Sequence, residues 1–236
     1  MSIPKQRRFW KEAAVSEEEE GFGVRLDTRP LMTPARRPLV VPTLPLAEAV
    51  AREWRTVEAE VRPETMPFTR TVNTSIDGVA ADPGGVVEMI AEYGGTDLLC
   101  YRAEGPDALR NRQFAAWDPL LAWSAETLDA PLVAVMGVMY APQPAASLAA
   151  LRRAVAAEDP FRLTGLAELV TLSGSLVIGL AVARGVLEPD AAWKISRIDE
   201  TWQEEQWGID AEAAALAAER RRSFLFAAEY LRLLDE

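Results

Sequence analysis

The feature that most constrains the fold is a change in the period of the apolar residues near position 42. Before it, Phe22, Val24 and Leu26 alternate with small or charged residues, a period of two typical of strands. After it, apolar residues recur every three or four positions, as they do on one face of an α-helix. The sequence therefore predicts an α+β protein. A small β-domain of short antiparallel strands spans residues 1–43, and a larger, mostly α-helical domain spans residues 44–236.

The helical part is expected to consist of helices joined by turns. The predicted runs are 46–61, 68–79, 86–93, 109–123, 145–157, 160–184, 189–208 and 210 to near the carboxyl end. Pro119 should interrupt the fourth run, and Gly185 should end the sixth. The uncharged stretch 169–183 is shorter than the ~20 residues of a membrane-spanning helix, which favours a buried core helix.

One segment does not follow the helical pattern. Residues 131–140 lie between prolines and are rich in valine. This composition predicts an extra extended strand, with the amino-terminal sheet as its candidate partner.

The absence of histidine excludes most familiar catalytic sites. Ser-His-Asp and Cys-His sites, a histidine general base and histidine-ligated zinc all need an imidazole, and the chain has none. The single Cys100 cannot form an internal disulfide or a multi-cysteine metal site, and its apolar neighbours predict a buried thiol. There is no phosphate-binding glycine motif either. We therefore expect neither catalytic residues nor a cofactor, and no small-molecule substrate.

The net charge of -11 indicates what kind of partner the chain can bind. Nucleic acids are bound through clustered Lys and Arg, so an acidic chain with a pI near 4.7 is poorly suited to them. A basic protein surface is the better candidate. The start of the sequence has no apolar signal segment. We expect a cytoplasmic monomer that does not insert into a membrane.

The acidic residues are densest in one carboxyl-terminal stretch. Asp199, Glu200, Glu204, Glu205 and Asp210 lie in or just after the run predicted over 189–208. Two carboxylates four residues apart could ligate a divalent cation, but an exposed acidic helix has the same spacing, and no calcium-loop motif accompanies it. We favour a solvated or partner-facing surface and expect no metal.

Tryptophans accompany these acids. Trp202 belongs to an inward apolar stripe with Ile195 and Ile198, whereas Asp199 and Glu200 are expected on the other side of the helix. Trp207 is equally compatible with the core and with an interface, because tryptophan is common in both. Trp54 is a further candidate contact, and packing in the core explains it as well.

The residues also resemble, from end to end, the assembly chaperones that bind the alpha subunit of F-type ATP synthase. The resemblance rests on many short matches in order. They are Arg8-Phe9-Trp10-Lys11, Leu26-Asp27, Arg29-Pro30-Leu31, Thr33-Pro34, Pro42-Thr43, Ala51, Glu53-Trp54, Met66-Pro67, Thr69, Asp77, Asp97-Leu98, Cys100-Tyr101-Arg102, Gln113, Trp117-Asp118-Pro119, Gly174-Ser175-Leu176, Asp199-Glu200, Trp202-Gln203, Glu205, Trp207-Gly208, Asp210 and Glu212-Ala213. Thr28 and Met32 stand where a glycine and a lysine are expected. No mitochondrial presequence is seen, so the chain resembles a bacterial member.

The resemblance implies a non-enzymatic chaperone that works without ATP. It would bind the free alpha subunit and shield the surface destined for the beta subunit until the catalytic hexamer assembles. It also implies that an acidic residue at Asp199 or Glu200 is important for function. The partner-binding candidates are Asp199, Glu200, Trp202, Glu204, Glu205, Trp207, Asp210 and Trp54. Two alternatives remain open: an enzyme that uses carboxylates and a divalent cation, and an interaction module with another protein partner.

Overall fold

The computed structural model describes residues 7–235, and these pack into two units. The first comprises the chain up to Pro83 together with residues 160–164 and the carboxyl-terminal turn from Tyr230. The second comprises 84–159 and 165–229. The change from strand to helix at residue 43 therefore lies inside the first packing unit. Residues 1–6, the start of the predicted β-domain, lie outside the described residues. The expectation that the start of the chain has no apolar signal segment concerns these residues too.

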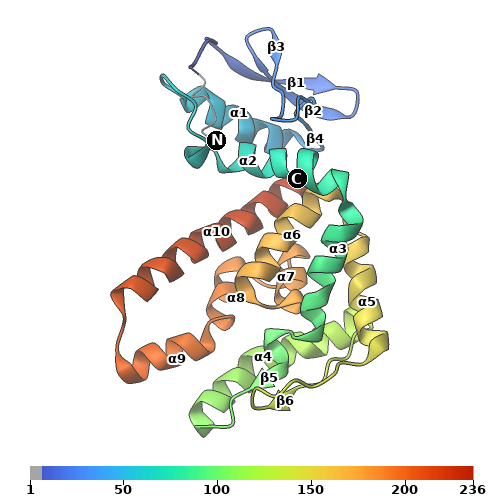
Figure 1. Ribbon diagram of the computed structural model, residues 1–236, viewed down its shortest axis with the longest axis vertical. Coiled ribbons are helices and arrows are strands. Elements are labelled where there is room, and N and C mark those ends of the chain that lie inside the picture. Colours follow the sequence, from blue (N-terminus) through green and yellow to red (C-terminus); the bar gives the residue numbers. More distant parts are fainter. Residues whose placement is uncertain (1–6, 236) are drawn as a thin grey trace. The chain divides into compact units, whose positions relative to one another are not determined.

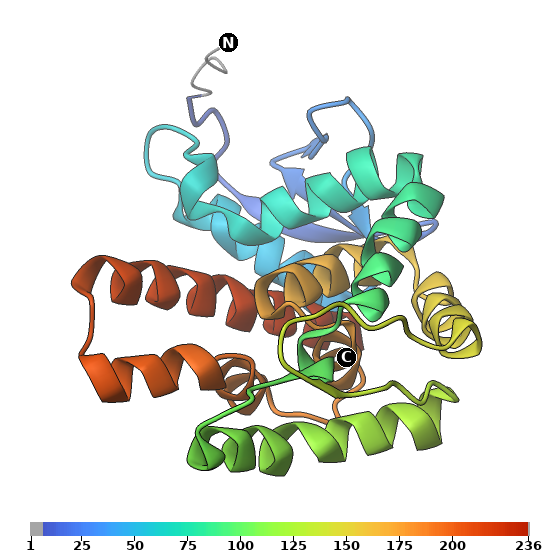
Figure 2. The same cartoon turned by 60° about the horizontal axis from the view of Figure 1, so that its bottom comes forward.

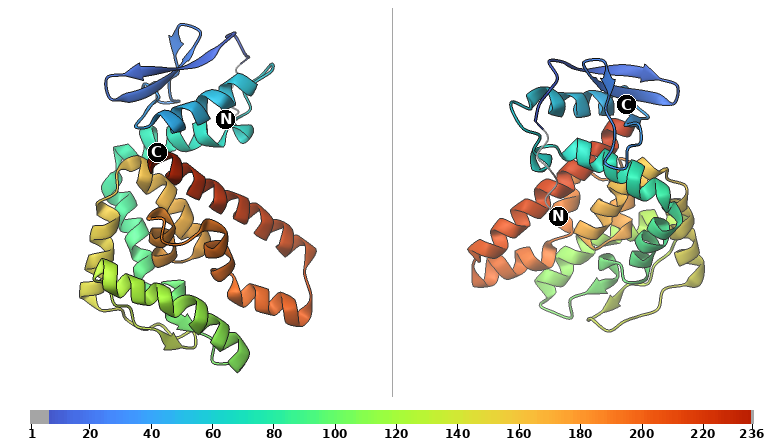
Figure 3. Two further views of the ribbon diagram at one scale, coloured as in Figure 1. Left: turned by 180° about the vertical axis from the view of Figure 1, so that it is seen from behind. Right: turned by 45° about the horizontal axis from the view of Figure 1, so that its top comes forward.

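An antiparallel sheet and two helices form the first unit, visible in Figures 1 and 3. The central strand β2 (Gly21–Leu26) pairs with β1 (Ala13–Glu18), β3 (Arg29–Pro30) and β4 (Val40–Val41). Helix α1 (Leu44–Thr56) packs against β1 and β2, and α2 (Pro67–Asn73) packs on α1. The sheet and the helices share a core, because the sheet is too small to bury its apolar face alone.

The first predicted helix ends earlier than its spacing indicates. Val57 is extended and lies beyond the end of α1, and Val61 is also outside it. The Arg8 guanidinium donates to the Val57 carbonyl oxygen (2.6 Å), and the Arg8 amide donates to the Ala59 carbonyl oxygen (2.8 Å). The amino-terminal segment therefore takes the carbonyl groups that another helical turn would have used.

Short turns complete this unit and lead into the second. They are η1 (Pro63–Thr65), η2 (Thr74–Gly78) and η3 (Val79–Ala81). A buried polar cluster lies beside them: the Ser75 hydroxyl is 2.8 Å from the Thr164 hydroxyl and 3.0 Å from the Tyr230 hydroxyl. These contacts attach residues 160–164 and the carboxyl-terminal residues from Tyr230 to this unit.

The second unit is almost entirely helical (Figures 1 and 2). Its elements are α3 (Pro83–Glu92), η4 (Tyr93–Gly95), η5 (Leu98–Cys100), β5 (Tyr101–Arg102), α4 (Asp107–Leu128), β6 (Val135–Met136), α5 (Ala145–Ala156), α6 (Pro160–Ser173), α7 (Leu176–Ala183), α8 (Pro189–Ile195), α9 (Ile198–Trp207) and α10 (Ala211–Asp235). Every residue of α7 is buried. This agrees with a core helix rather than a membrane span, and none of the described helices is long and apolar enough to cross a bilayer.

Two long predicted helices are each divided in the structure. The run over 160–184 breaks at Gly174, which has a positive φ of 71°, and Ser175 caps α7 by accepting from the Ile178 amide (3.0 Å). The run over 189–208 breaks after Ile195. There the indole of Trp117 donates to the Ile195 carbonyl oxygen (2.8 Å), which a continuous helix would have used itself.

Two further predictions are corrected. Helix α4 continues through Pro119 because Trp117 and Leu120 on either side are buried, and this packing outweighs the lost backbone hydrogen bond. The strand predicted at 131–140 shrinks to β6, and it pairs in parallel with β5 rather than with the amino-terminal sheet. Both strands of this small sheet belong to the second unit.

Candidate functional site: an acidic helical hairpin

The acidic residues singled out in the sequence lie on a hairpin formed by α9 and the first half of α10. Helix α9 ends at Trp207, and the following Gly208 has a φ of 91°, which disfavours any residue with a side chain. Asp210 then caps α10 by accepting a hydrogen bond from the Ala213 amide (2.7 Å). Figure 2 shows the two helices, orange and red, running back along each other from this turn.

This hairpin concentrates negative charge. Between Ile198 and Glu219 there are seven acidic residues and no basic ones. The acids are Asp199, Glu200, Glu204, Glu205, Asp210, Glu212 and Glu219. We call residues 198–219 the acidic hairpin. Charges of one sign on an exposed surface attract a basic partner and speed its association.

Asp199 and Glu200 have different environments, although they are neighbours. Asp199 accepts a hydrogen bond from the side-chain amide of Gln113 (2.5 Å). Gln113 is fully buried in α4, and its carbonyl oxygen accepts from the Ala103 amide (2.8 Å). Glu200 is exposed, and its carboxylate pairs with the Arg197 guanidinium (3.1 Å). The prediction that both acids face away from the packed side is therefore wrong for Asp199, which fastens α9 to α4.

A second contact between the same helices involves Arg112. Its guanidinium bonds both carboxylate oxygens of Glu205 (2.9 and 2.7 Å) and lies over the ring of Trp202, 4.8 Å from the ring centroid. Glu204 lies 3.9 Å from Arg197. Trp202 is half-buried, as its place in the inward stripe predicts. These three residues of α9 therefore contact arginines of the same unit and also lie at least partly at the surface.

The hairpin exposes apolar side chains at its turn and on α10. Trp207 is 80% exposed, and Ile209 and Leu216 are also mostly exposed. Tryptophan is rarely left this accessible unless a partner covers it, because burial of its large ring is favourable. The sequence candidates did not include Ile209 or Leu216. The signal that could have indicated Ile209 is its position between Gly208 and Asp210, where an apolar residue is unusual inside a polar turn.

Trp54 does not lie on the surface. It is buried in the first unit, its ring is 5.1 Å from that of Trp10, and its indole donates to the Thr69 hydroxyl (3.2 Å). The structure therefore gives this residue a packing role, and we do not retain it as a contact.

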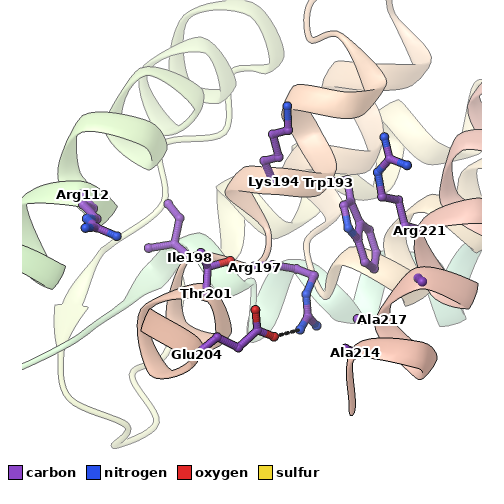
Figure 4. Close-up of a pocket in the computed structure, with 11 residues that line it drawn as sticks. Arg112, Trp193, Lys194, Arg197, Ile198, Thr201, Glu204, Ala214, Ala217 and Arg221 are labelled. Carbon is purple, nitrogen blue, oxygen red and sulfur yellow. Dashed lines mark ion pairs between the residues drawn. The ribbon is translucent and has the colours of Figure 1, made fainter. Parts of the chain in front are cut away.

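A groove lies between α8–α9 and α10, with a volume of about 490 Å³ (Figure 4). Its apolar lining comprises Trp193, Ile198, Ala214, Ala217 and Ala218. Its cations are engaged by carboxylates of the same chain: Lys194 and Arg221 both contact Asp190, and Arg197 contacts Glu204. These partners, Lys194 first and then Arg221, hold the pKa of Asp190 below its usual value. The groove therefore has an apolar base, and these cations are already paired with carboxylates. It is a poor site for a small anion.

The described residues offer neither a metal-binding cluster nor a reactive thiol. Among them, no three carboxylate or thiol groups are grouped so that they could hold a metal ion. Burial raises the pKa of the Cys100 thiol to about 12, which leaves it unreactive at neutral pH. Burial also lowers the pKa of Arg102, a side chain that lies against the rings of Phe114 and Trp117 and pairs with Asp118 (2.8 Å). These buried groups connect elements of the second unit.

Comparison with known proteins decides the family. The model of the ATP12 chaperone protein family matches residues 7–125, half of the chain. The chain belongs to the ATP12 chaperone family.

Solved structures that resemble this protein cover nearly the whole chain. Atp12 of Paracoccus denitrificans is 47% identical, with a TM-score of 0.94 over 97% of this chain and 98% of that one. The Atu1473 protein of Agrobacterium tumefaciens is 41% identical, with a TM-score of 0.89 over 99% and 87%. The mitochondrial atp12 protein of Schizosaccharomyces pombe is 24% identical over 87% of this chain and 75% of its own length. As an ATP12 chaperone, the protein is an assembly factor for ATP synthase and not an enzyme.

Proposed function

We propose that this chaperone binds the free alpha subunit of F-type ATP synthase through its acidic hairpin. It would shield the surface destined for the beta subunit until the catalytic hexamer assembles, and it would do so as a cytoplasmic monomer without using ATP. The observation that carries the proposal is the run of seven acids without a base, next to an exposed tryptophan, in an ATP12 chaperone.

The chemistry of this surface suits a partner that must later leave. An apolar anchor such as Trp207 contributes affinity, whereas acids around it contribute steering and speed. Charged contacts at the rim of an interface are weak individually, because solvent screens them. Binding should therefore be rapid, dependent on salt and reversible. By mass action, a bound alpha subunit is unavailable for aggregation.

The test is coexpression of a tagged alpha subunit with the chaperone. The wild type should raise the soluble yield and copurify with the subunit. Glu200→Lys with Glu212→Lys should abolish copurification, because it reverses two exposed charges of the hairpin and leaves Asp199 and Glu205 in place. Glu19→Lys with Glu20→Lys is the matched control, since it makes the same charge change at exposed positions of the first unit.

The outcomes distinguish the alternatives. If the wild type neither copurifies with the alpha subunit nor raises its yield, the proposal is wrong. If both charge-reversal variants lose binding equally, net charge rather than the hairpin governs association. A pull-down from the native cell that recovers another protein in place of the alpha subunit would support an interaction module with a different partner.

A further inference from the structure

A second surface of unusual composition lies in the second unit, apart from the acidic hairpin. From Ala130 to Leu151 the chain has 22 residues and no charged side chain, although 26% of the whole sequence is charged. The middle of this stretch, residues 133–140, contains β6. We call it the uncharged segment.

The uncharged segment exposes its apolar side chains instead of burying them. Val138 is 91% exposed and Met139 is 81% exposed, and Val133, Met136 and Tyr140 are exposed as well. Isolated apolar residues at a surface are normal, but five within eight consecutive positions form a patch. In a protein that folds alone, such a patch would promote aggregation unless something covers it.

The backbone of the segment offers an open strand edge. β6 pairs on one side with β5, with Tyr101 opposite Val135 and Arg102 opposite Met136. The Gly137 amide donates to the Arg102 carbonyl oxygen (2.8 Å). Because successive residues of a strand direct their backbone groups to opposite edges, Met136 directs its N–H and C=O away from β5. No strand among residues 7–235 pairs with that edge.

The charge pattern restricts what can cover this segment. The Glu104 carboxylate lies beside Gly137, but the segment itself carries no charged side chain. A charged partner group placed against it would lose hydration without gaining a counter-charge from the segment, so the complementary surface is largely uncharged. The buried centre of a subunit interface has that character, because charged residues are depleted there. A chaperone whose client exposes an unassembled subunit interface therefore needs an uncharged surface as well as an acidic one.

The two surfaces are also connected within the second unit. Gln113 accepts from the Ala103 amide, immediately after β5, and donates to Asp199 of α9. One buried side chain thus holds the β5–β6 sheet and the acidic hairpin to the same helix, α4. This continuity allows one client to contact both surfaces.

We propose that the uncharged segment receives an extended, uncharged, apolar segment of the client, which adds as a strand to the free edge of β6. This inference rests on the proposed function, because the client is the alpha subunit. Main-chain hydrogen bonds to Met136 would set the register, and Val138 and Met139 would supply apolar contacts. The acidic hairpin would bind the charged rim of the same client.

The test measures the affinity of the free alpha subunit for purified full-length variants. Val138→Ser with Met139→Ser should weaken binding by about tenfold or more, since the complex loses two apolar side chains that the client would bury. Met89→Ser with Val186→Ser is the matched control, because these residues are also exposed apolar positions of the second unit. Hydrogen exchange adds a backbone readout: the Met136 amide should exchange at least about tenfold more slowly in the complex.

Each result decides a separate point. Equal affinity of the wild type and the Val138→Ser, Met139→Ser variant would overturn this inference and leave the proposed function intact. The inference would also be overturned if the client did not slow hydrogen exchange of the Met136 amide. Concentration-dependent self-association of the wild type, lost in the variant, would make a second copy the occupant instead. A wild type that binds no alpha subunit would overturn the proposed function and the inference together.

Discussion

Replacing Asp199 and Glu200 one at a time should separate a structural acid from a functional one. Asp199→Ala removes the acceptor of the Gln113 side-chain amide, and a buried donor left without a partner costs about 1–3 kcal/mol. Glu200→Ala removes one exposed contact with Arg197, where a pair of this kind contributes about 0–1 kcal/mol. Both residues lie in the first turn of α9, so the loss of favourable interaction with the helix dipole is similar and cancels in the comparison.

We therefore expect Asp199→Ala to be about 1–2 kcal/mol less stable than Glu200→Ala. For a chain of this size, the midpoint of thermal unfolding should differ by roughly 2–8 °C. Urea unfolding followed by circular dichroism measures the free-energy difference, and heating with the same probe measures the midpoint. Glu200→Ala should keep the stability of the wild type while it weakens binding of the alpha subunit.

A double-mutant cycle assigns the effect to the Gln113 contact. Gln113→Met alone should be destabilising, because the Ala103 amide also loses its acceptor. Adding Asp199→Ala to that variant should cost at least ~1 kcal/mol less than it costs in the wild type. If Asp199→Ala proves as stable as Glu200→Ala, or if the two substitutions add without coupling, the assignment of Asp199 to a structural role is wrong.

Two further predictions concern packing and reactivity in the second unit. Gly179→Ala should lower the free energy of unfolding by ~1 kcal/mol, because the new methyl would lie 2.5 Å from Val170 Cγ2 and overpacking outweighs the gain in helix propensity. Urea unfolding measures this loss of stability. A second substitution, Val170→Ala, should reduce the cost of Gly179→Ala. A Gly179→Ala variant more stable than the wild type would contradict the close contact. Cys100 should resist a thiol reagent at pH 8 in the native protein and react fully in urea, since a pKa of about 12 leaves about one thiol in ten thousand ionised. Rapid labelling of the native protein would show that the thiol is accessible.

The sequence predicted the composition of the fold more reliably than the ends of its elements. The change of period near residue 42 correctly indicated strands followed by helices, because local alternation determines which face of an element can be buried. The helix ends at Thr56 and Ile195 were not predictable in this way. In both places a side chain distant in sequence, Arg8 or Trp117, bonds a carbonyl oxygen that the next helical turn would have used.

The candidate site shows the same difference between what a local pattern indicates and what distant contacts decide. The acids and Trp207 were found from composition alone, because charge density and a tryptophan beside a glycine are local features. Their roles were not. Asp199 and Glu200 are adjacent acids in one sequence pattern, yet only Asp199 meets a buried amide of α4.

What the sequence by itself determined was therefore the class of protein. A chain without histidine, with one thiol and a charge of -11, lacks the groups for most catalysis and favours a binding role. The tertiary structure decided which residues are available for binding. It buried Trp54, fastened Asp199, and left Trp207 and the uncharged segment exposed. The physical reason is that exposure and hydrogen-bond partners depend on contacts between residues far apart in the chain, which a local pattern does not contain.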